Sequence, residues 1–452
     1  MIKRLFIALL SIAIIVVSCK KDDGNGPVVI PSSHTETETE EPEQKPATEE
    51  IYTVEKGKVL PPWQEGCLDI HSINSGRGEC FFYIFPDGTT MLIDAAGSLL
   101  STTAEKPPTP AKPSSSITSG QVITDYINHY LPEVADGRLN YLMVSHFHSD
   151  HMGTYSTSLP YHSSGKFRKT GITEVGGNIP FDKIFDRGTL TNLPSSDPIG
   201  TTAISNYNNF ITWAKTAYGA TYEKFEAGRN DQIVLKHDAS KYTTFEVRNL
   251  AANGYVWTGS GSESSTAMPA LADLQAWKKS DSADARLPYE NILSCVLHLR
   301  YGMFDYFCGG DIQYNGVSTY PYKDIEAPIA KVMGHVEVMK ACHHGTANTN
   351  SQALLNALTP DAMIVGVWRN VQPNYDTIGR TFKASSNCQI FTTNMTDDNK
   401  VTLSDYMNRF KETSGHIVVR VQPGGRVYSI YTLDDNNQEY KVKGIFGPYS
   451  CK

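Results

Sequence analysis

The chain has 452 residues, of which 40% are hydrophobic and 19% charged, and its formal net charge at pH 7 is −8. Residues 1–34 carry +2 and residues 35–50 carry −6, so residues 51–452 are left with −4. Because a mildly acidic body has no broad basic field, non-specific binding to nucleic acid is disfavoured.

The chain opens with the features of an export signal. Lys3 and Arg4 precede an apolar run over residues 5–17, which is shorter than the about 20 residues that a membrane-spanning helix needs. The letters VVSC then place Cys19 in the arrangement of a lipoprotein cleavage box. Residues 1–18 are therefore predicted to be a lipoprotein signal peptide, with Cys19 as the lipid-modified first residue of the mature protein. An ordinary signal peptide with an incidental cysteine is the alternative.

A tether is predicted between the lipid and the folded body. The letters KKDD directly after Cys19 resemble the tag that directs some bacterial lipoproteins to the cell surface. Residues 24–50 are rich in Glu, Thr and Pro and have little apolar surface to bury, which is typical of disorder. Residues 19–50 are thus expected to be a lipidated, disordered acidic tether. It would hold the exported protein at the outer membrane or on the cell surface.

The first part of the body reads as strands followed by a helix and one further strand. Apolar residues recur at helical spacing between Val122 and Tyr130. Short β-prone runs separated by Gly-containing turns predict strands. These predicted strands cover residues 68–74, 80–85, 90–94 and 139–144.

Residues 156–288 are harder to interpret. Apolar residues between Ile204 and Tyr218 predict one amphipathic helix, and the segment contains no repeat. We expect this segment to be an insertion that forms the pocket wall and sets specificity, as loops on rigid scaffolds often do.

Regular elements return after Asn291. A hairpin is predicted over residues 294–308 and ends in Gly-Gly-Asp311. A strand over residues 336–342 ends in His-His-Gly, and Ser351 is expected to cap a helix that runs to Leu358. Further strands are predicted at residues 361–367, 417–421 and 426–431. Strands and helices that alternate in two halves indicate a layered α/β domain.

Three imidazoles and one carboxylate lie together in the run His146-Phe147-His148-Ser149-Asp150-His151. Imidazole and carboxylate are the ligands of zinc and other first-row divalent ions. With only 13 histidines in the chain, this spacing is improbable by chance. The run follows a predicted buried strand, so a rigid sheet would aim the ligands. The sequence therefore predicts a metal site.

The order of the motifs resembles the metallo-β-lactamase fold, in particular the hydrolase domain of ComEC-type DNA-uptake proteins and their stand-alone relatives. The resemblance covers approximately residues 67–155 and 289–425. It implies a four-layer αββα sandwich over residues 51–452, interrupted by the insertion at 156–288. The motifs that carry it are the opening strand and glycine turn at 70–79, Asp94, the HxHxDH run, Asp311 and the His-His-Gly-Thr letters at 343–346.

The resemblance implies two divalent metal ions about 3.5–4 Å apart. Zinc is the expected metal, with manganese or iron as alternatives. His146 and His148 would bind the first ion. Asn291 would help them, although other branches of the family have a histidine at its position. Asparagine is usual in the ComEC-like group and is the weaker ligand.

The second ion would be bound by Asp150 and His151, and the two oxygens of Asp311 would bridge both ions. One of His343 and His344 would complete this second site. Because side chains alternate along a strand, these two histidines are expected to point in opposite directions. The other histidine would then donate a hydrogen bond to the substrate or protonate a leaving group. Asp150, His343 and His344 are accordingly the predicted catalytic residues.

Two further residues are expected to support the ligands. Asp94 would orient a ligating imidazole through the ring nitrogen that faces away from the metal. A turn former at the end of a strand is the alternative for Asp94. His71 lies near the metals by resemblance and would have a similar supporting role.

These features together predict a lipid-anchored, extracytoplasmic metallohydrolase of phosphoester or phosphodiester bonds, in which the metals activate a water molecule. Its substrate would be a small-molecule or polymer phosphoester, without strong binding to nucleic acid. One alternative is a metal-dependent nuclease that acts on DNA or RNA. Another is a non-catalytic surface lipoprotein that binds a ligand. The sequence does not indicate the oligomeric state.

Overall fold

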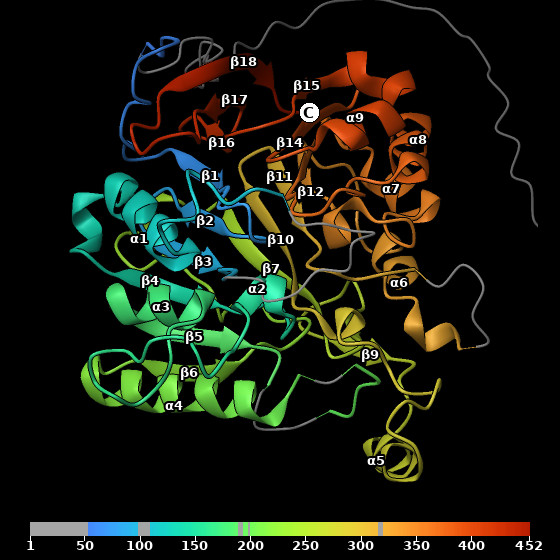
Figure 1. Ribbon diagram of the computed structural model, residues 1–452. Helices are drawn as coiled ribbons and strands as arrows, with labels where there is room; N and C mark the ends of the chain where they lie inside the picture. The colour runs from blue at the N-terminus through green and yellow to red at the C-terminus, as the bar shows by residue number, and fades with distance from the viewer. Residues whose placement is uncertain (1–52, 98–108, 189–192, 198, 315–319) are drawn as a thin grey trace, which may run out of the picture. The chain divides into compact units, whose positions relative to one another are not determined.

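The computed structural model describes residues 53–97, 109–188, 193–197, 199–314 and 320–452 (Figure 1). The predicted signal peptide, Cys19 and the tether up to residue 50 lie outside the described residues. Within the described ranges, no helix has both the length and the apolar character required to cross a bilayer.

One nine-stranded sheet combines strands from both ends of the body, in the order β18-β17-β16-β1-β2-β3-β4-β5-β6. Strands β3 to β6 run parallel to one another, whereas the remaining neighbours are antiparallel. Its strands are β1 (Leu68–Ser72), β2 (Phe81–Ile84), β3 (Thr90–Ile93), β4 (Leu139–Met143), β5 (Phe181–Asp186), β6 (Thr221–Lys224), β16 (His416–Val421), β17 (Val427–Leu433) and β18 (Val442–Ser450).

The second nine-stranded sheet has the order β15-β14-β13-β12-β11-β10-β7-β8-β9. Strands β11 to β15 are parallel, and the others pair antiparallel. Its strands are β7 (Phe245–Ala252), β8 (Tyr255–Trp257), β9 (Ser264–Thr266), β10 (Val296–Tyr301), β11 (Phe304–Cys308), β12 (Val338–Lys340), β13 (Ala362–Val365), β14 (Gln389–Thr392) and β15 (Phe410–Glu412).

The described helices lie mainly between parallel strands, as crossover connections require. They are α1 (Ser119–Tyr130), α2 (Ser149–Met152), α3 (Gly171–Asn178), α4 (Thr201–Ala217), α5 (Leu271–Ser280), α6 (Glu326–Ala330), α7 (Gln352–Leu358), α8 (Tyr375–Ala384) and α9 (Asp397–Thr402). The predicted cap of α7 is confirmed, since the Ser351 hydroxyl accepts a hydrogen bond from the Leu354 backbone N–H at 3.2 Å.

The two sheets pack face to face over a shared apolar core. Ile70 and Tyr83 enter this core from the first sheet, and Leu299 and Tyr306 enter it from the second. The hydroxyls of Tyr83 and Tyr306 lie 3.3 Å apart and join the sheets across the core. The inter-sheet core covers one face of β2 and the helical layer covers the other, which explains why its FFYI run is buried throughout.

Helices cover the outer face of each sheet (Figure 1). Ile123 of α1 and Phe210 of α4 belong to one buried cluster with Leu142 of β4. On the second sheet, Leu355 of α7 belongs to another buried cluster with Met363 of β13. The resulting order of layers is helix, sheet, sheet, helix. The predicted four-layer αββα sandwich is therefore confirmed.

The prediction that residues 156–288 form an insertion is wrong. The segment supplies β5 and β6 to the first sheet and β7, β8 and β9 to the second. The described residues of this segment belong to the same compact unit as the rest of the body. The apolar alternation of residues 156–288 is weak in the sequence because β6 and β9 are edge strands. Their side chains are partly or fully exposed, so they carry little apolar alternation.

Candidate metal centre

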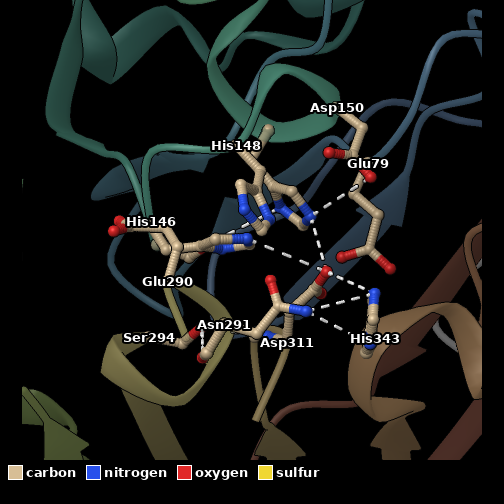
Figure 2. Close-up of polar contacts among 12 residues, drawn as sticks. Glu79, His146, His148, Asp150, Glu290, Asn291, Ser294, Asp311 and His343 are labelled. Atoms are coloured by element: carbon tan, nitrogen blue, oxygen red, sulfur yellow. Dashed lines mark hydrogen bonds and ion pairs between the residues drawn. The ribbon is translucent and has the colours of Figure 1, made fainter. Parts of the chain in front are cut away.

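The predicted ligands converge because they follow the carboxyl ends of neighbouring strands. Asp94 follows β3 and the histidine run follows β4, and these two strands are parallel neighbours. Asp311 follows β11, and the His343-His344 pair follows β12, its parallel neighbour in the second sheet. Loops at the carboxyl ends of parallel strands meet at one edge of a sheet. Figure 2 shows the resulting cluster.

A glycine turn packs directly against the histidine loop. Gly78 has φ +106°, and a Cβ atom at this position would lie 2.1 Å from the carbonyl oxygen of Asp150. The next residue, Glu79, donates its backbone N–H to that same oxygen at 3.0 Å. The glycine therefore allows the β1–β2 connection to approach the ligand loop, which places the Glu79 side chain inside the cluster.

Asp311 stands at the centre of the cluster, where interactions with the surrounding rings converge (Figure 2). Its Oδ2 atom lies 3.1 Å from Nε2 of His151 and 3.5 Å from Nε2 of His344. The Nε2 atoms of His343 and His146 are 3.8 and 3.9 Å from the same oxygen. Burial alone would raise the pKa of Asp311, but the neighbouring imidazoles hold it well below its ordinary value. One buried carboxylate thus faces four imidazoles.

The ligands expected for the second ion form the tighter group. Asp150, His151, Asp311 and His344 each offer one ligand atom, and these atoms lie within 4.8 Å of one another. Oδ2 of Asp150 is 3.1 Å from Nε2 of His344 and 3.9 Å from Nε2 of His151. All four residues are buried. The structure therefore brings together the set of side chains that the sequence assigned to one ion.

Each imidazole of this set has a partner on its far side. Nδ1 of His151 donates to Oδ2 of Asp94 at 2.7 Å, which is the position predicted for Asp94. Nδ1 of His344 donates to the carbonyl oxygen of Gly366 at 2.8 Å and lies 3.1 Å from Oε1 of Glu79. These hydrogen bonds leave Nε2 of both rings facing the cluster, as metal-ligating histidines require.

The ligands expected for the first ion are arranged less closely. Nε2 of His146 is buried and has no hydrogen-bond partner among the described residues. The ring of His148 packs 4.8 Å from that of His146, but its Nε2 atom contacts Oδ2 of Asp197 at 3.2 Å. Asn291 lies beside His343, with its Nδ2 atom 3.3 Å from both ring nitrogens. In the described part of the chain, the Oδ1 atom of Asn291 has no hydrogen-bond partner.

His343 and His344 were expected to alternate along a strand, but the structure does not show this. Strand β12 ends at Lys340, and both histidines lie in a turn with left-handed φ angles of +46° and +55°. His344 is fully buried in the cluster, whereas the side chain of His343 is 24% exposed. The turn places His344 among the ligands and leaves His343 at the rim, beside Gln313 at 2.9 Å.

The prediction that His71 supports the ligands is wrong. Nδ1 of His71 contacts the Tyr126 hydroxyl at 2.9 Å, and its Nε2 atom lies 3.6 Å from Asp69. Its ring packs with those of Phe82 and Tyr130. The side chain therefore faces the layer of α1, whereas the ligands gather at the carboxyl ends of β3 and β4. Its position along β1 gave no information about which face it occupies.

A buried lysine lies within the cluster and was missed in the sequence. Nζ of Lys340 lies 2.6 Å from Glu79 and 3.5 Å from Oδ1 of Asp311, and it donates to the carbonyl oxygen of Gly310 at 2.7 Å. Burial would lower the pKa of Lys340, but Glu79 and Asp311 raise it above its ordinary value, so the ammonium is charged. The signal in the sequence was a lysine inside the strand predicted over residues 336–342.

The charges of the cluster fit two divalent cations. Four buried carboxylates surround the site and Lys340 is the one buried ammonium described among them, so three negative charges remain uncompensated when the imidazoles are neutral. Two divalent cations together with one further anion would match this charge. The carboxylates belong to Glu79, Asp94, Asp150 and Asp311.

Unpartnered atoms in the cluster point to the same conclusion. Nε2 of His146 is buried without a hydrogen-bond partner among the described residues, and Oδ1 of Asp311 is buried with only the Lys340 ammonium beside it, at 3.5 Å. Burial would lower the pKa of His344, but Glu79 and Asp311 raise it to about 10. The cluster therefore attracts cations, and metal binding would displace protons from it.

A cavity of about 680 Å³ opens beside the cluster. Its lining side chains are mainly polar and include amides, imidazoles and one guanidinium. The described lining residues come from 148–150 and 313–374, and none comes from 156–288. They are His148, Ser149, Asp150, Gln313, His343, Thr346, Ala347, Asn348, Trp368, Arg369, Val371, Gln372 and Asn374.

The described residues of 156–288 therefore do not line this cavity, contrary to expectation. They contribute instead to a second cavity of about 520 Å³, which Phe147 and Glu290 also line. One residue of the segment reaches the metal centre, because Asp197 contacts His148 and accepts the backbone N–H of Glu290 at 2.7 Å.

Neither a protein-family model nor a curated protein matches the chain. Among solved structures, the chain is similar to the metallo-β-lactamase fold protein YhfI from Bacillus subtilis, with 9% identity, a TM-score of 0.33, and coverage of 73% of this chain and 97% of that one. It is also similar to Igni18, a metallo hydrolase from the archaeon Ignicoccus hospitalis, with 10% identity, a TM-score of 0.32, and coverage of 79% and 96%.

These identities and TM-scores are too low to carry an argument about the chemistry of this chain. The fold is established by the two sheets and their helical layers. The metal centre is identified by its own side chains, above all by the buried carboxylate of Asp311 and the imidazoles that face it.

Proposed function

We propose that the protein is a metal-dependent hydrolase of phosphoester bonds, with phosphodiesters as the expected substrates. The observation that carries this proposal is the position of Asp311, whose single Oδ2 atom faces four imidazoles next to a polar cavity of about 680 Å³. A buried carboxylate in this position can be shared by two cations, and the adjoining cavity gives a substrate access to them.

The candidate ligands form two sets that would share Asp311. His146 and His148, together with Asn291, would hold one cation. Asp150, His151 and His344 would hold the other, with Asp311 common to both. When bound, such a pair of cations supplies a water molecule activated at neutral pH and stabilises negative charge on the substrate.

The surrounding residues would keep this arrangement in register. Asp94 accepts the Nδ1–H of His151, and the carbonyl oxygen of Gly366 accepts that of His344 with Glu79 beside it, so that Nε2 of both rings faces inward. Lys340 holds the outer oxygen of Asp311. At the rim, His343 lines the cavity and can donate a hydrogen bond to an oxygen of the substrate.

The proposal predicts metal-dependent turnover of bis-p-nitrophenyl phosphate. Purified protein supplemented with Zn²⁺ or Mn²⁺ should hold two metal equivalents per chain by elemental analysis and should release p-nitrophenol. Dialysis against a chelator should abolish turnover. Adding the metal back should restore it, because the ligand side chains are already clustered in the metal-free protein. Protein that holds two equivalents but is inert toward phosphodiesters and phosphomonoesters would contradict the proposal.

The same preparation separates the alternative functions. Cleavage of plasmid DNA or RNA in a gel assay would favour a nuclease, whereas hydrolysis of nitrocefin would indicate β-lactam cleavage. Stoichiometric metal without any turnover would favour a non-catalytic binding protein. The charge of −4 on residues 51–452 supports a small or locally held phosphoester over a long nucleic acid.

We further propose that Cys19 is lipid-modified and anchors the exported protein in the outer membrane, with the cell surface as the expected side. The support is the signal-like N-terminus followed by the letters VVSC. In a bacterial host with lipoprotein processing, the full chain should partition into the detergent phase of Triton X-114. The variant Cys19→Ala should move to the aqueous phase. Equal partitioning of both proteins would refute lipidation.

A further inference from the structure

A short loop after β13 joins the metal centre to the wall of the cavity. The carbonyl oxygen of Gly366 accepts the Nδ1–H of His344, and Nε1 of Trp368 lies 3.2 Å from Nε2 of the same ring. The side-chain oxygen of Gln372 accepts the backbone N–H groups of Trp368 and Arg369, both at 3.0 Å. Trp368 and Gln372 are buried, so the loop is held rigidly against the cluster.

This loop presents a guanidinium to the cavity. The Cζ atom of Arg369 lies 3.9 Å from the centroid of the Trp368 ring, which is the stacked geometry of a cation–π contact. Arg369 lines the same cavity as Asp150 and His343, both of which belong to the metal centre. The tryptophan thus fixes the guanidinium beside the reaction site.

The half-buried Arg369 lacks the carboxylate partner that the buried Arg187 and Arg420 have. Arg187 pairs with Glu290 at 2.6 Å, and Arg420 pairs with Asp69 at 2.6 Å. No ion pair joins Arg369 to any described carboxylate, and its buried Nε atom has no hydrogen-bond partner among the described residues. Burial lowers the pKa of Arg369 and nearby Asp150 opposes this shift, but a guanidinium stays charged in proteins.

A held but unpaired guanidinium fits an anionic ligand. Its planar array of donors matches the oxygens of a phosphoryl group, and stacking on an aromatic ring reduces the freedom lost on binding. A neutral ester or amide would offer no charge to this group. The amide side chains of Gln313 and Asn348 line the same cavity and can donate further hydrogen bonds to oxygen atoms.

We propose that Arg369, stacked on Trp368, is the anion-binding residue of the cavity and selects substrates whose reacting group is an anionic phosphoester. This inference rests on the proposed hydrolase function for its substrate, but the binding of an anion at Arg369 does not require turnover. The loop after β13 would thus recognise the negative charge of the substrate.

The test measures binding of inorganic phosphate to the metal-loaded protein by isothermal titration calorimetry. Arg369→Met should weaken phosphate binding about 10- to 100-fold, the loss expected for a charged hydrogen bond. Arg369→Lys should lose less, because it keeps the charge without the planar donors. The matched control is Arg300→Met, which removes an exposed arginine paired with Asp305 and should bind phosphate as the wild type does.

Elemental analysis and circular dichroism should show unchanged metal content and fold in both Arg369 variants. The KM of bis-p-nitrophenyl phosphate should rise in Arg369→Met, whereas the KM of neutral p-nitrophenyl acetate, if it is turned over, should not change. Wild-type phosphate affinity in Arg369→Met would overturn the inference even if the enzyme hydrolyses phosphodiesters. Phosphate binding that depends on Arg369, without hydrolysis of any phosphoester, would support the inference and overturn the proposed function.

Discussion

Replacing Asp311 by asparagine is expected to weaken metal binding and to abolish the proposed hydrolase activity together. The change keeps the size of the side chain but removes the charge that faces the imidazoles of His151 and His344. The loss of kcat/KM should exceed the roughly 10- to 100-fold effect typical of residues that only orient a ligand. Elemental analysis should show fewer than two equivalents per chain, because both ions depend on this carboxylate.

The control for this variant lies on the same hairpin. Asp305 stands in β11 and pairs with His298 and Arg300, away from the ligand cluster. Asp305→Asn should therefore retain metal content and turnover. If Asp311→Asn kept both metals and wild-type turnover, Asp311 would not be the shared ligand and the proposed metal centre would be refuted.

Replacing Lys340 by methionine is expected to have the largest effect on stability. In the metal-free protein Lys340 is the buried ammonium beside Glu79 and Asp311, at 2.6 and 3.5 Å. Its removal breaks the buried ion pair with Glu79 and, among the described residues, leaves only His344 beside that carboxylate, at 3.1 Å, and breaking a buried pair typically costs about 3–5 kcal/mol. Urea unfolding of the metal-free protein should show this decrease in the free energy of unfolding.

A second substitution tests the cause of that decrease. In the double variant Glu79→Gln/Lys340→Met, the carboxylate left unpaired by the first change is also neutralised, so stability should partly recover relative to Lys340→Met alone. The exposed pair of Lys400 with Asp397 provides the control, since Lys400→Met should change stability little. If the effects of Glu79→Gln and Lys340→Met on the free energy of unfolding were simply additive in the double variant, the two residues would not be coupled.

Much of the fold could be predicted because its strands are apolar on both faces. The runs that became β2, β4 and β10 are bounded by turns and carry few polar residues, so their extent is clear from sequence. The segment 156–288 was misinterpreted because its strands include exposed edges. The residues of β9 are exposed throughout, and those of β6 are at most half-buried. Only pairing with neighbouring strands reveals them as parts of the two sheets.

The local chemistry of the metal centre was also accessible from sequence. The HxHxDH run, Asp311 after two glycines and the His-His-Gly turn each concentrate ligand atoms next to a strand end. The type of ligand and its place next to a strand end are properties of short segments, so they can be identified without knowledge of the fold. The prediction for His71 was wrong because the position of a residue in a strand does not determine which neighbours its side chain contacts.

The amino-acid sequence by itself determined the kinds of ligand, the strands that carry them and the layered class of the fold, because these depend on local apolar pattern and local chemistry. Only the tertiary structure decided which charges meet. Glu79 and Lys340 lie far apart in the chain and are joined at 2.6 Å because the two sheets pack face to face. The same packing leaves Arg369 stacked on Trp368 without a carboxylate partner among the described residues. Such charge relations depend on long-range packing, to which no short segment is sensitive.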